Sequence, residues 1–542
     1  IENNKFAYKD LLLKGSTAVV EKQPEPEIAI PTTPSSLEMD EIKHKLIKIY
    51  AEVLDMPEDK IQSDAHFIDD LGGDSLQVLS IALKTEDAFS VTIPVEQYPQ
   101  CATVNDLASL LYSLVRGNVS YERSTQPTAR EIVPVTKFGE SKEYIAFKER
   151  QQMLLSHGLE NPYFVVHDST LLDTSKMNGQ DVLNFGSYNY VGMSGRKEVN
   201  EAAIKAIEQY GTSASGSRLL AGEKQIHRDL EKTIAAFKNS EDAIVLVGGH
   251  STNVTFVGNF CGKNDLILYD ALAHNSIEQG CKLSESTSKP FPHNDPQALE
   301  QLLRLHRHKY EKVLIIIEGA YSMDGDIANV PAFVALKKKY GCFLLVDEAH
   351  SACVIGKNGG GVDEYFGLAH DDIDIKMGTL SKGIGTCGGY LAGTKELIEY
   401  LRYNLPGFVF SVGISPALAA AAQEAILQLK KNPSIMENLH RNIKCFVEEA
   451  AKHEFNICLA GETAIIPILV GSDENAFLLS NLLAKHGVFV PPAVYPAVPK
   501  NKARLRFCVI SEHKPEQIAH ALNTLQSLVD QLGIVLPKPG RV

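Results

Sequence analysis

Four short apolar segments, separated by stretches of helical character, limit the fold of this chain more than any other feature. They are AIVLVGG, LILYD, VLIIIEG and CFLLVDE, at residues 243–249, 266–270, 313–319 and 342–348. Helical periodicity appears near them, for example at residues 225–237 and 331–339. Apolar strands that alternate with helices form a mostly parallel sheet with helices on its faces. We therefore predict an α/β domain built on such a sheet.

The composition is that of an ordinary globular protein and argues against several functional classes. Of 542 residues, 44% are hydrophobic and 22% are charged, and this length predicts more than one domain. The formal net charge of −14 argues against nucleic-acid binding, which requires basic surfaces. The chain has no apolar run of about 18 residues, so we predict no transmembrane segment. Its nine scattered cysteines lack the spacing of metal ligands or of a disulfide framework, which predicts no metal site and reduced thiols in a cytoplasmic protein.

Polar segments that contain proline divide the chain. The predicted parts are a tail and linker at 1–36, a compact unit at 37–116, a second linker at 117–140 and the α/β domain at 141–542, whose small α+β subdomain begins near 430. Within that subdomain, residues 503–510 predict a strand and residues 515–532 a closing helix. The chain begins with Ile1 rather than Met, so we expect a fragment or a processed product, and we predict no signal peptide.

The unit at 37–116 has the pattern of a small helical bundle. Apolar residues recur at helical spacing over 37–54 and 104–115, which predicts three or four short helices. Between these stretches, Asp74-Ser75-Leu76 follows the segment FIDDLGG. A helix N-cap at Asp74 or Ser75 would explain the polar pair but not the wider motif.

This unit resembles the acyl carrier domain, in which the serine of an Asp-Ser-Leu motif carries 4'-phosphopantetheine. The resemblance implies that a phosphopantetheinyl transferase modifies Ser75. The arm would then present an acyl thioester to a neighbouring domain at high effective concentration. Residues 1–15 loosely resemble the end of an acyl- or aminoacyl-adenylating domain, but a leader without fixed structure is the preferred interpretation. The alternative, that resemblance, implies an upstream acyl-activating domain or enzyme as a further partner.

Asp347 and Lys382 form the most informative pair of polar residues. Asp347 ends an apolar segment, and Lys382 lies between serine and glycine in TLSKGIG. A lysine can bind the aldehyde of pyridoxal 5'-phosphate as a Schiff base, and an aspartate can keep the pyridine nitrogen protonated so that the ring accepts electrons. Each residue taken alone has an ordinary explanation: Asp347 could end a buried strand, and Lys382 could be a solvated loop lysine.

Residues near this pair extend the pattern. His350 follows Asp347 by three residues, so it can reach the phenolic oxygen of the same cofactor. His274 could stack on the ring face or be an ordinary half-buried histidine. The segment VGGHSTN ends a strand and opens a helix, where the backbone N–H groups of Gly249 and His250 would suit a phosphate.

Six motifs of the large domain occur in the order found in one enzyme family. They are NFGSYNYVGMSG (184–195), GTSASGSRLLAGEKQIHRDLE (211–231), EGAYSMDGD (318–326), VDEAHS (346–351), TLSKGIG (379–385) and YPAVPKNKARLRFCVISEH (495–513). With them, the domain resembles the α-oxoamine synthases, a branch of the fold-type I pyridoxal phosphate enzymes. The resemblance implies a large domain with a seven-stranded, mostly parallel sheet and a smaller α+β C-terminal domain.

The same resemblance implies roles around the cofactor. Lys382 would bind the cofactor and act as acid and base for the α-proton of the substrate. Asp347 would pair with the pyridine nitrogen, and His350 would contact the phenolic oxygen. His274 would stack on the ring, and Ser322 would support the ring's oxygen.

Phosphate contacts follow from the resemblance as well. Thr379 would hold the phosphate together with Gly249 and His250. Ser411 would reach the phosphate of the neighbouring subunit, which implies a homodimer with shared sites.

The substrate contacts that the resemblance implies are less complete. Arg506 would clamp the amino acid carboxylate, a contact that suits a bidentate guanidinium, with Arg504 as a nearby rival. Asn189 would lie near the substrate. The chain departs from the family pattern at two positions. Val494 stands where some members have a further arginine, and His250 stands where many have an aromatic residue, so the carboxylate geometry stays open.

These roles imply a decarboxylating Claisen condensation. A small α-amino acid (glycine, alanine or serine) would react with an acyl thioester carried on Ser75, and loss of CO2 would give an α-aminoketone. Three alternatives remain: use of acyl-CoA with the carrier serving another step, an aminotransferase, and a carrier scaffold without catalysis. The intact Asp347, His350 and Lys382 argue against the scaffold. The acyl chain, the amino acid and the pathway depend on pocket shape and stay open.

Overall fold

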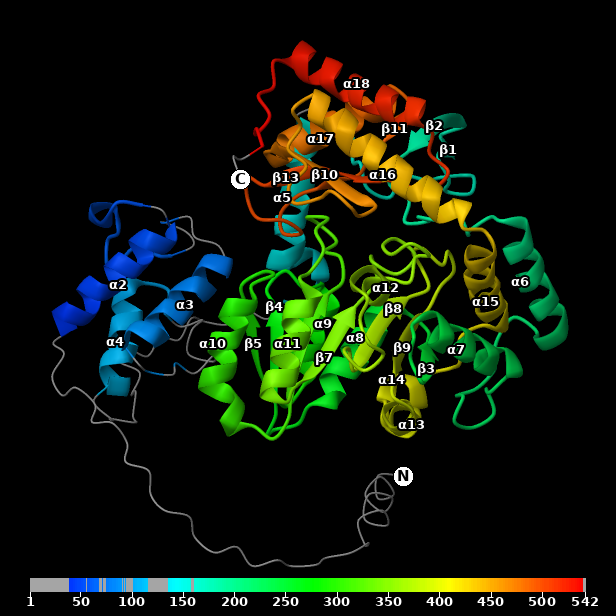
Figure 1. The fold of residues 1–542 in the computed structure, drawn as a ribbon. Coiled ribbons are helices and arrows are strands. Elements are labelled where there is room, and N and C mark those ends of the chain that lie inside the picture. Colours follow the sequence, from blue (N-terminus) through cyan, green and yellow to red (C-terminus); the bar gives the residue numbers. More distant parts are fainter. Residues whose placement is uncertain are drawn as a thin grey trace, which may run out of the picture. The chain divides into compact units, whose positions relative to one another are not determined.

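The computed structural model describes residues 39–54, 56–67, 75–89, 101–115, 135–156 and 160–539, with the single residues 71, 91 and 93. The predicted tail at 1–36, most of the second linker and the residues just before Ser75 lie outside the described residues. The chain forms two compact units (Figure 1). The exact domain boundaries stay predictions.

The smaller unit is a helical bundle. Its elements are α2 (Met39–Leu54), η1 (Glu58–Lys60), α4 (Val104–Val115) and the end of α3 (Ser75–Phe89). On α2, Ile42, Leu46 and Tyr50 recur every four residues and are buried, because this spacing places them on one face of the helix. The Tyr50 ring packs edge-on against Phe67 with 5.6 Å between ring centres. Ser75 is the first residue of α3, and its side chain lies outside the described part.

The larger unit is built on a seven-stranded sheet in the order β3-β9-β8-β7-β6-β4-β5. Its strands are β3 (Asp242–Leu246), β4 (Leu266–Asp270), β5 (Thr287–Phe291), β6 (Val313–Glu318), β7 (Phe343–Asp347), β8 (Ile375–Thr379) and β9 (Gly389–Gly393). Neighbouring strands pair in parallel except at β9, which is antiparallel to both β3 and β8. The predicted mostly parallel sheet is therefore confirmed.

Helices cover both faces of this sheet (Figure 1). One face packs against α8 (Gly249–Phe260), α9 (Asn275–Leu283), α13 (Lys395–Asn404) and α14 (Pro406–Val409). The other packs against α7 (Gln225–Phe237), α10 (Pro296–His306), α11 (Val330–Tyr340), α12 (Val362–Phe366) and α15 (Pro416–Lys431), with α6 (Lys197–Tyr210) beside α15. All six residues of β6 are buried, as expected for a parallel strand covered on both sides.

A smaller α+β layer completes the larger unit. It contains the antiparallel sheet β10-β13-β12, formed by β10 (Ile465–Gly471), β12 (Pro492–Ala493) and β13 (Ala503–Cys508), and the helices α16 (Ser434–Lys452), α17 (Asp473–Lys485) and α18 (Pro515–Leu532). A third sheet pairs β1 (Thr174–Met177) and β2 (Gln180–Asn184) with β11 (Val488–Phe489). The other elements are η3 (Phe138–Glu140), α5 (Lys142–Ser156) and η4 (Arg307–Lys309). None of the helices within the described residues combines the length and the apolar composition needed to cross a bilayer.

Five strands of the large sheet deliver residues to one edge. Because β4, β6 and β7 run parallel, their last residues, Asp270, Glu318 and Asp347, end at the same edge. Strand β8 ends there at Thr379, and β3 leads into Gly249 at the start of α8. Open α/β sheets bind ligands in the crevice outside the carboxyl ends of their strands. The fold therefore places a candidate site at this edge.

Candidate active site

A cavity of about 210 Å³ lies at the carboxyl ends of the strands. Seven of the predicted site residues line it: Gly249, His250, His274, Asp347, His350, Thr379 and Lys382. Within residues 160–539, which the structure describes without a gap, four others do not line this cavity: Asn189, Ser322, Ser411 and Arg506. The structure thus brings residues from five strand ends into one crevice, as the predicted cofactor site requires.

Asp347 is held at the floor of the crevice by a chain of hydrogen bonds. Its Oδ2 accepts from Asn253 Nδ2 at 2.7 Å, and its Oδ1 accepts from the backbone N–H of Ala349 at 2.9 Å. Asn253 Nδ2 also donates to Ser276 Oγ at 3.0 Å, and Ser276 Oγ lies 2.8 Å from His274 Nδ1. A buried carboxylate with both oxygens hydrogen-bonded keeps a fixed direction. Among these hydrogen-bonded residues, Asn253 Oδ1 is buried without a hydrogen-bond partner.

His274 has a defined tautomer. The backbone N–H of Ser276 donates to His274 Nδ1 at 3.2 Å, so this nitrogen is an acceptor. Burial lowers the pKa of His274, against the opposing charge of Asp347, so the neutral ring carries its proton on Nε2. The same contact caps α9, so His274 serves the fold as well as facing the crevice.

Lys382 lies against His350. Lys382 Nζ is 2.6 Å from His350 Nε2, and His350 Nδ1 is 2.8 Å from the hydroxyl of Tyr190. Burial lowers the pKa of Lys382 to about 8, although the nearby carboxylates of Asp347 and Glu318 oppose this shift. Burial and the charge of Lys382 together lower the pKa of His350 well below its usual value, which keeps its ring neutral. The amine can therefore change protonation state near neutral pH.

Glu318 is a site residue that the sequence analysis did not single out. It ends β6 in direct register with Asp347 of β7, and it lines the same cavity. Burial and the charge of Asp347 raise its pKa well above the usual range. Its Oε1 accepts from the backbone N–H of His274 at 2.5 Å, which fixes the loop after β4. A carboxylate at the end of an apolar strand was the signal used for Asp347, and the same signal marks Glu318.

The start of α8 forms a cradle for an anion. Gly248 at its N-cap has no side chain to cap the first N–H groups of the helix. A Cβ on Gly249 would lie 2.8 Å from Thr379 Oγ1, so only glycine permits this close approach. Thr379 Oγ1 also lies 2.6 Å from Ser381 Oγ. Backbone N–H groups at a helix start and nearby hydroxyls suit a phosphate.

The two predicted arginines differ in their surroundings. Arg504 is occupied by Asp324 Oδ1 at 2.8 Å and by the carbonyl of Met323 at 2.9 Å. Arg506 is buried, donates from Nε to the carbonyl of Ser322 at 2.6 Å, and places its guanidinium 5.0 Å from the ring centre of Tyr188. Of the two, Arg506 is the better placed to meet a substrate carboxylate.

Asn189 and its neighbour Tyr188 differ in their surroundings. Asn189 is buried, donates from Nδ2 to the carbonyls of Leu171 and Ser194, and accepts from the backbone N–H of Ser194. Tyr188, which we had not singled out, has its ring centre 5.9 Å from Lys382 Nζ. The polar atoms of Asn189 thus hold the loop, and Tyr188 lies beside Lys382.

Pyridoxal phosphate fits these residues. The crevice offers an amine, a fixed carboxylate and an uncapped helix start, which are the three groups that the aldehyde, the pyridine nitrogen and the phosphate need. The glycine cradle beside Thr379 and the unpartnered Asn253 Oδ1 both lie at this site. The individual roles of these residues stay predictions.

His293 joins the two loops that flank the crevice. Its Nδ1 lies 3.0 Å from Asp270 Oδ1, and its Nε2 lies 3.1 Å from Asp326 Oδ2. Burial alone would lower the pKa of His293, but the two carboxylates outweigh it and raise the pKa to about 10. The hydroxyl of Tyr321 donates to the other oxygen of Asp270 at 2.7 Å. His293 is therefore an imidazolium that ties the loop before His274 to the loop after Ser322.

Replacing His293 with glutamine is expected to destabilise the larger unit by on the order of 3 kcal/mol at pH 6, because two buried carboxylates lose their cation. The folded pKa of His293 lies above its unfolded value of about 6.5, so its contribution is complete below pH 6.5 and is lost as the pH rises through about 10. Thermal unfolding of both proteins at pH 6 and pH 9.5 tests this. The difference in melting temperature between the unmodified protein and His293→Gln should be smaller at pH 9.5 than at pH 6. The exposed control His308→Gln should melt at the same temperature as the unmodified protein at both pH values. An equal difference in melting temperature at both pH values would contradict a protonated His293 between Asp270 and Asp326.

Known proteins resemble both units of the chain. Residues 180–525 match the family model described as aminotransferase class I and II, and residues 44–111 match the one described as phosphopantetheine attachment site. An 8-amino-7-oxononanoate synthase of Treponema denticola is 40% identical over 359 residues, 66% of this chain and 90% of its own. One of Thermoanaerobacter pseudethanolicus is 38% identical over 388 residues, 72% of this chain and 98% of its own. The solved serine palmitoyltransferase of S. paucimobilis is 30% identical with a TM-score of 0.70, and the match covers 72% of this chain and 99% of that one.

Proposed function

The chain belongs to the class I and II aminotransferase family, in its branch of pyridoxal phosphate-dependent α-oxoamine synthases, and we propose that it condenses a small α-amino acid with an acyl thioester carried on Ser75. The amino acid is glycine, alanine or serine, and loss of CO2 leaves an α-aminoketone. One observation carries this proposal: a single chain holds both a phosphopantetheine attachment domain and a crevice in which Lys382, His350 and Asp347 meet.

Each part of the crevice has one task toward pyridoxal phosphate. Asp347 would pair with the pyridine nitrogen, Lys382 would bind the aldehyde carbon and His274 would lie against the ring. The start of α8 and Thr379 would hold the phosphate. When bound, the cofactor supplies an electron-accepting ring that stabilises negative charge on the α-carbon of the amino acid.

Lys382 moves the α-proton. Its lowered pKa of about 8 lets Nζ be both a base and an acid near neutral pH, which is the condition for efficient proton transfer. His350 is neutral and lies 2.6 Å from this amine, so it can accept a hydrogen bond and hold Nζ in place. The hydroxyl of Tyr190 fixes the far side of the His350 ring at 2.8 Å. The three residues thus form one positioned acid–base unit.

Arg506 binds the carboxylate of the amino acid. Its guanidinium is buried, and its Nε is held by the carbonyl of Ser322. Bidentate binding by a guanidinium orients a carboxylate more firmly than a lysine does. Arg504 is paired with Asp324 and does not compete for this role.

The carrier brings the second substrate. A phosphopantetheine arm on Ser75 raises the concentration of the acyl thioester at the crevice to the millimolar range without a high-affinity acyl-CoA site. A phosphopantetheinyl transferase attaches the arm, and an upstream acyl-activating domain or enzyme supplies the acyl group. The proposed enzyme is a homodimer in which Ser411 would contact the phosphate in the partner's site.

A loading experiment tests the proposal. The full chain, carrying the arm on Ser75, is charged with acyl groups of several lengths and offered glycine, alanine and serine in turn. Mass spectrometry should find an α-aminoketone and one released CO2 per product for at least one pair. Transfer of the amino group without carbon–carbon bond formation would instead identify an aminotransferase. Turnover of acyl-CoA alone, with the charged carrier inert, would assign the carrier to another step.

A further inference from the structure

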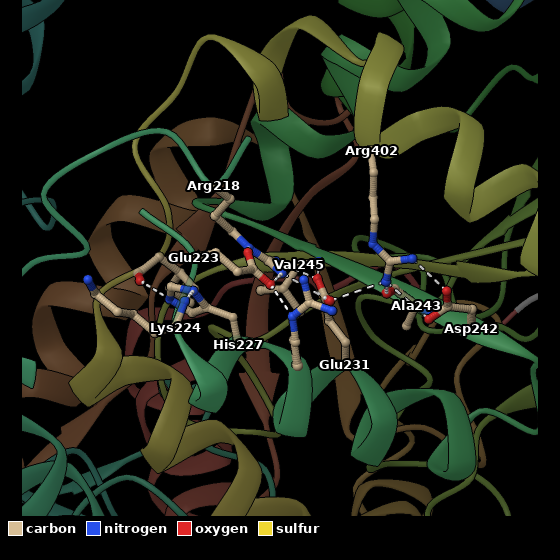
Figure 2. Close-up of polar contacts among 11 residues, drawn as sticks. Arg218, Glu223, Lys224, His227, Glu231, Asp242, Ala243, Val245 and Arg402 are labelled. Carbon is tan, nitrogen blue, oxygen red and sulfur yellow. Dashed lines mark hydrogen bonds and ion pairs between the residues drawn. The ribbon is translucent and has the colours of Figure 1, made fainter. Parts of the chain in front are cut away.

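A buried ion network lies outside the cofactor crevice and is centred on Glu231 of α7 (Figure 2). The carboxylate of Glu231 accepts hydrogen bonds from Arg218 Nη1 at 2.5 Å and from Arg402 Nη2 at 3.2 Å. The backbone N–H of Val245 in β3 donates to the same carboxylate at 2.9 Å. Glu231 therefore joins the loop at residues 211–223, helix α13 and the large sheet.

Each of the two arginines in this network also pairs with a second carboxylate. Arg218 Nε lies 2.6 Å from Glu223 Oε2, and Arg402 Nη1 lies 2.6 Å from Asp242 Oδ2. Loss of one partner from a buried pair leaves a charge without compensation, which costs far more than loss of a surface pair. The network therefore fixes loop 211–223 against the sheet.

Loop 211–223 in turn holds the segment at residues 405–415. Ser217 Oγ donates to the carbonyl of Val409 at 2.6 Å. Further contacts are the N–H of Gly413 to the carbonyl of Gly216 at 3.1 Å, and the Arg218 guanidinium to the Phe408 ring at 5.1 Å. The held segment carries Ser411, so the position of Ser411 depends on the network around Glu231.

Ser411 lies outside the crevice of its own chain. Within residues 160–539, which are described without a gap, it is not among the residues that line the cavity beside Lys382. The exposed apolar residues on the two segments include Leu219, Leu220, Phe410 and Val412, with Phe410 exposed by 87%. Exposed apolar side chains on two segments that contact each other are typical of a surface that a partner covers. The homodimer of the proposed function supplies this partner as a second copy of the chain.

We propose that Arg218, Glu231 and Arg402 are positioning residues that act in trans, because they set Ser411 for the cofactor phosphate in the partner subunit's site. This inference rests on the proposed homodimer. Each crevice then depends on the ion network of the other subunit. A change at Glu231 weakens cofactor binding across the subunit boundary and leaves the crevice of its own chain intact.

Hybrid dimers of Glu231→Gln and Lys382→Ala subunits test this inference. Two different affinity tags isolate the hybrid, and only the site with Lys382 gives the visible absorbance of lysine-bound cofactor. In the Glu231→Gln homodimer, the cofactor dissociation constant should rise about tenfold, roughly one lost contact. In the hybrid, the site that retains Lys382 receives Ser411 from a subunit with an intact network. Its dissociation constant should return to the wild-type value.

Two results would contradict the role in trans. If the hybrid site binds cofactor as weakly as the Glu231→Gln homodimer, the network acts in cis and the inference is wrong. Hybrids of Ser411→Ala with Lys382→Ala should behave like those of Glu231→Gln, and a failure to do so would also overturn it. A purely structural role would not distinguish the hybrid from the homodimer.

Further variants keep the test interpretable. If Glu231→Gln does not fold, Arg402→Gln replaces it, because Arg402 is only partly buried and reaches the same carboxylate. Arg441→Gln is the control: Arg441 is exposed on α16, outside the segments that the network joins, and its loss should leave cofactor binding unchanged. Sedimentation separates the two proposals. A monomer would overturn both the homodimer and the trans role, whereas a dimer without recovery in the hybrid overturns the trans role alone.

Discussion

Replacing Lys382 with alanine is expected to lower the rate of condensation by roughly 10²–10⁴-fold, the usual effect of removing a positioned acid–base group. Lys382 Nζ lies 2.6 Å from His350 Nε2, and burial lowers its pKa to about 8, so it is suited to exchange a proton near neutral pH. The rate is measured with saturating amino acid and a charged carrier. The visible absorbance of lysine-bound cofactor should vanish in the same variant.

The control for this variant is Lys485→Ala, which removes an exposed lysine at the end of α17. It should leave both the absorbance and the rate unchanged. Added amines that partly restore the rate of Lys382→Ala would support a proton-transfer role over a purely structural one. Retention of the absorbance in Lys382→Ala would falsify the assignment of the cofactor-binding lysine.

The elements that could be predicted from the sequence are those whose pattern is local. The helices predicted at 225–237 and 515–532 have these same bounds in the structure, as α7 and α18. Their apolar residues recur every three or four positions, so one face is identified without knowledge of its partner. The predicted strand at 266–270 likewise coincides with β4.

Strand β8 could not be predicted in this way. The sequence of β8, IKMGT, contains a lysine and a glycine, and a polar residue in so short a segment suggests a loop. The structure buries Lys376 because its amine donates to the carbonyl of Lys238 at 2.9 Å and lies 3.2 Å from Asp363 Oδ2. A charged residue in a central strand depends on partners that are remote in sequence, so no local pattern reveals it.

The same distinction between local patterns and remote partners applies to the residues of the candidate site. Asp347 and Lys382 could be selected because each stands next to an apolar segment or a glycine turn. Glu318 carries the same signal as Asp347 and could have been selected too. Asn253 and Tyr190 could not, because they act on residues 94 and 160 positions away, and only the folded sheet brings them together.

Replacing Ser75 with alanine is expected to abolish product formation from carrier-bound donors. Ser75 is the first residue of α3, and it lies within residues 44–111, which match a phosphopantetheine attachment site in sequence. Without its hydroxyl the arm has no attachment point, and intact mass after treatment with a phosphopantetheinyl transferase should show no added group. Ser80→Ala, on the same helix, is the matched control and should still accept the arm.

The same variant separates the carrier from the catalytic crevice. Ser75→Ala retains every residue around Lys382, so it should bind cofactor with wild-type absorbance and still react slowly with a small soluble thioester. Since a tethered arm supplies its thioester at a millimolar effective concentration, a soluble donor at micromolar concentration should react roughly 10²–10³-fold more slowly. Wild-type turnover of Ser75→Ala with soluble acyl-CoA at that concentration would contradict the proposed donor. In that case Lys382 would act on free thioesters, and the carrier would serve a different reaction.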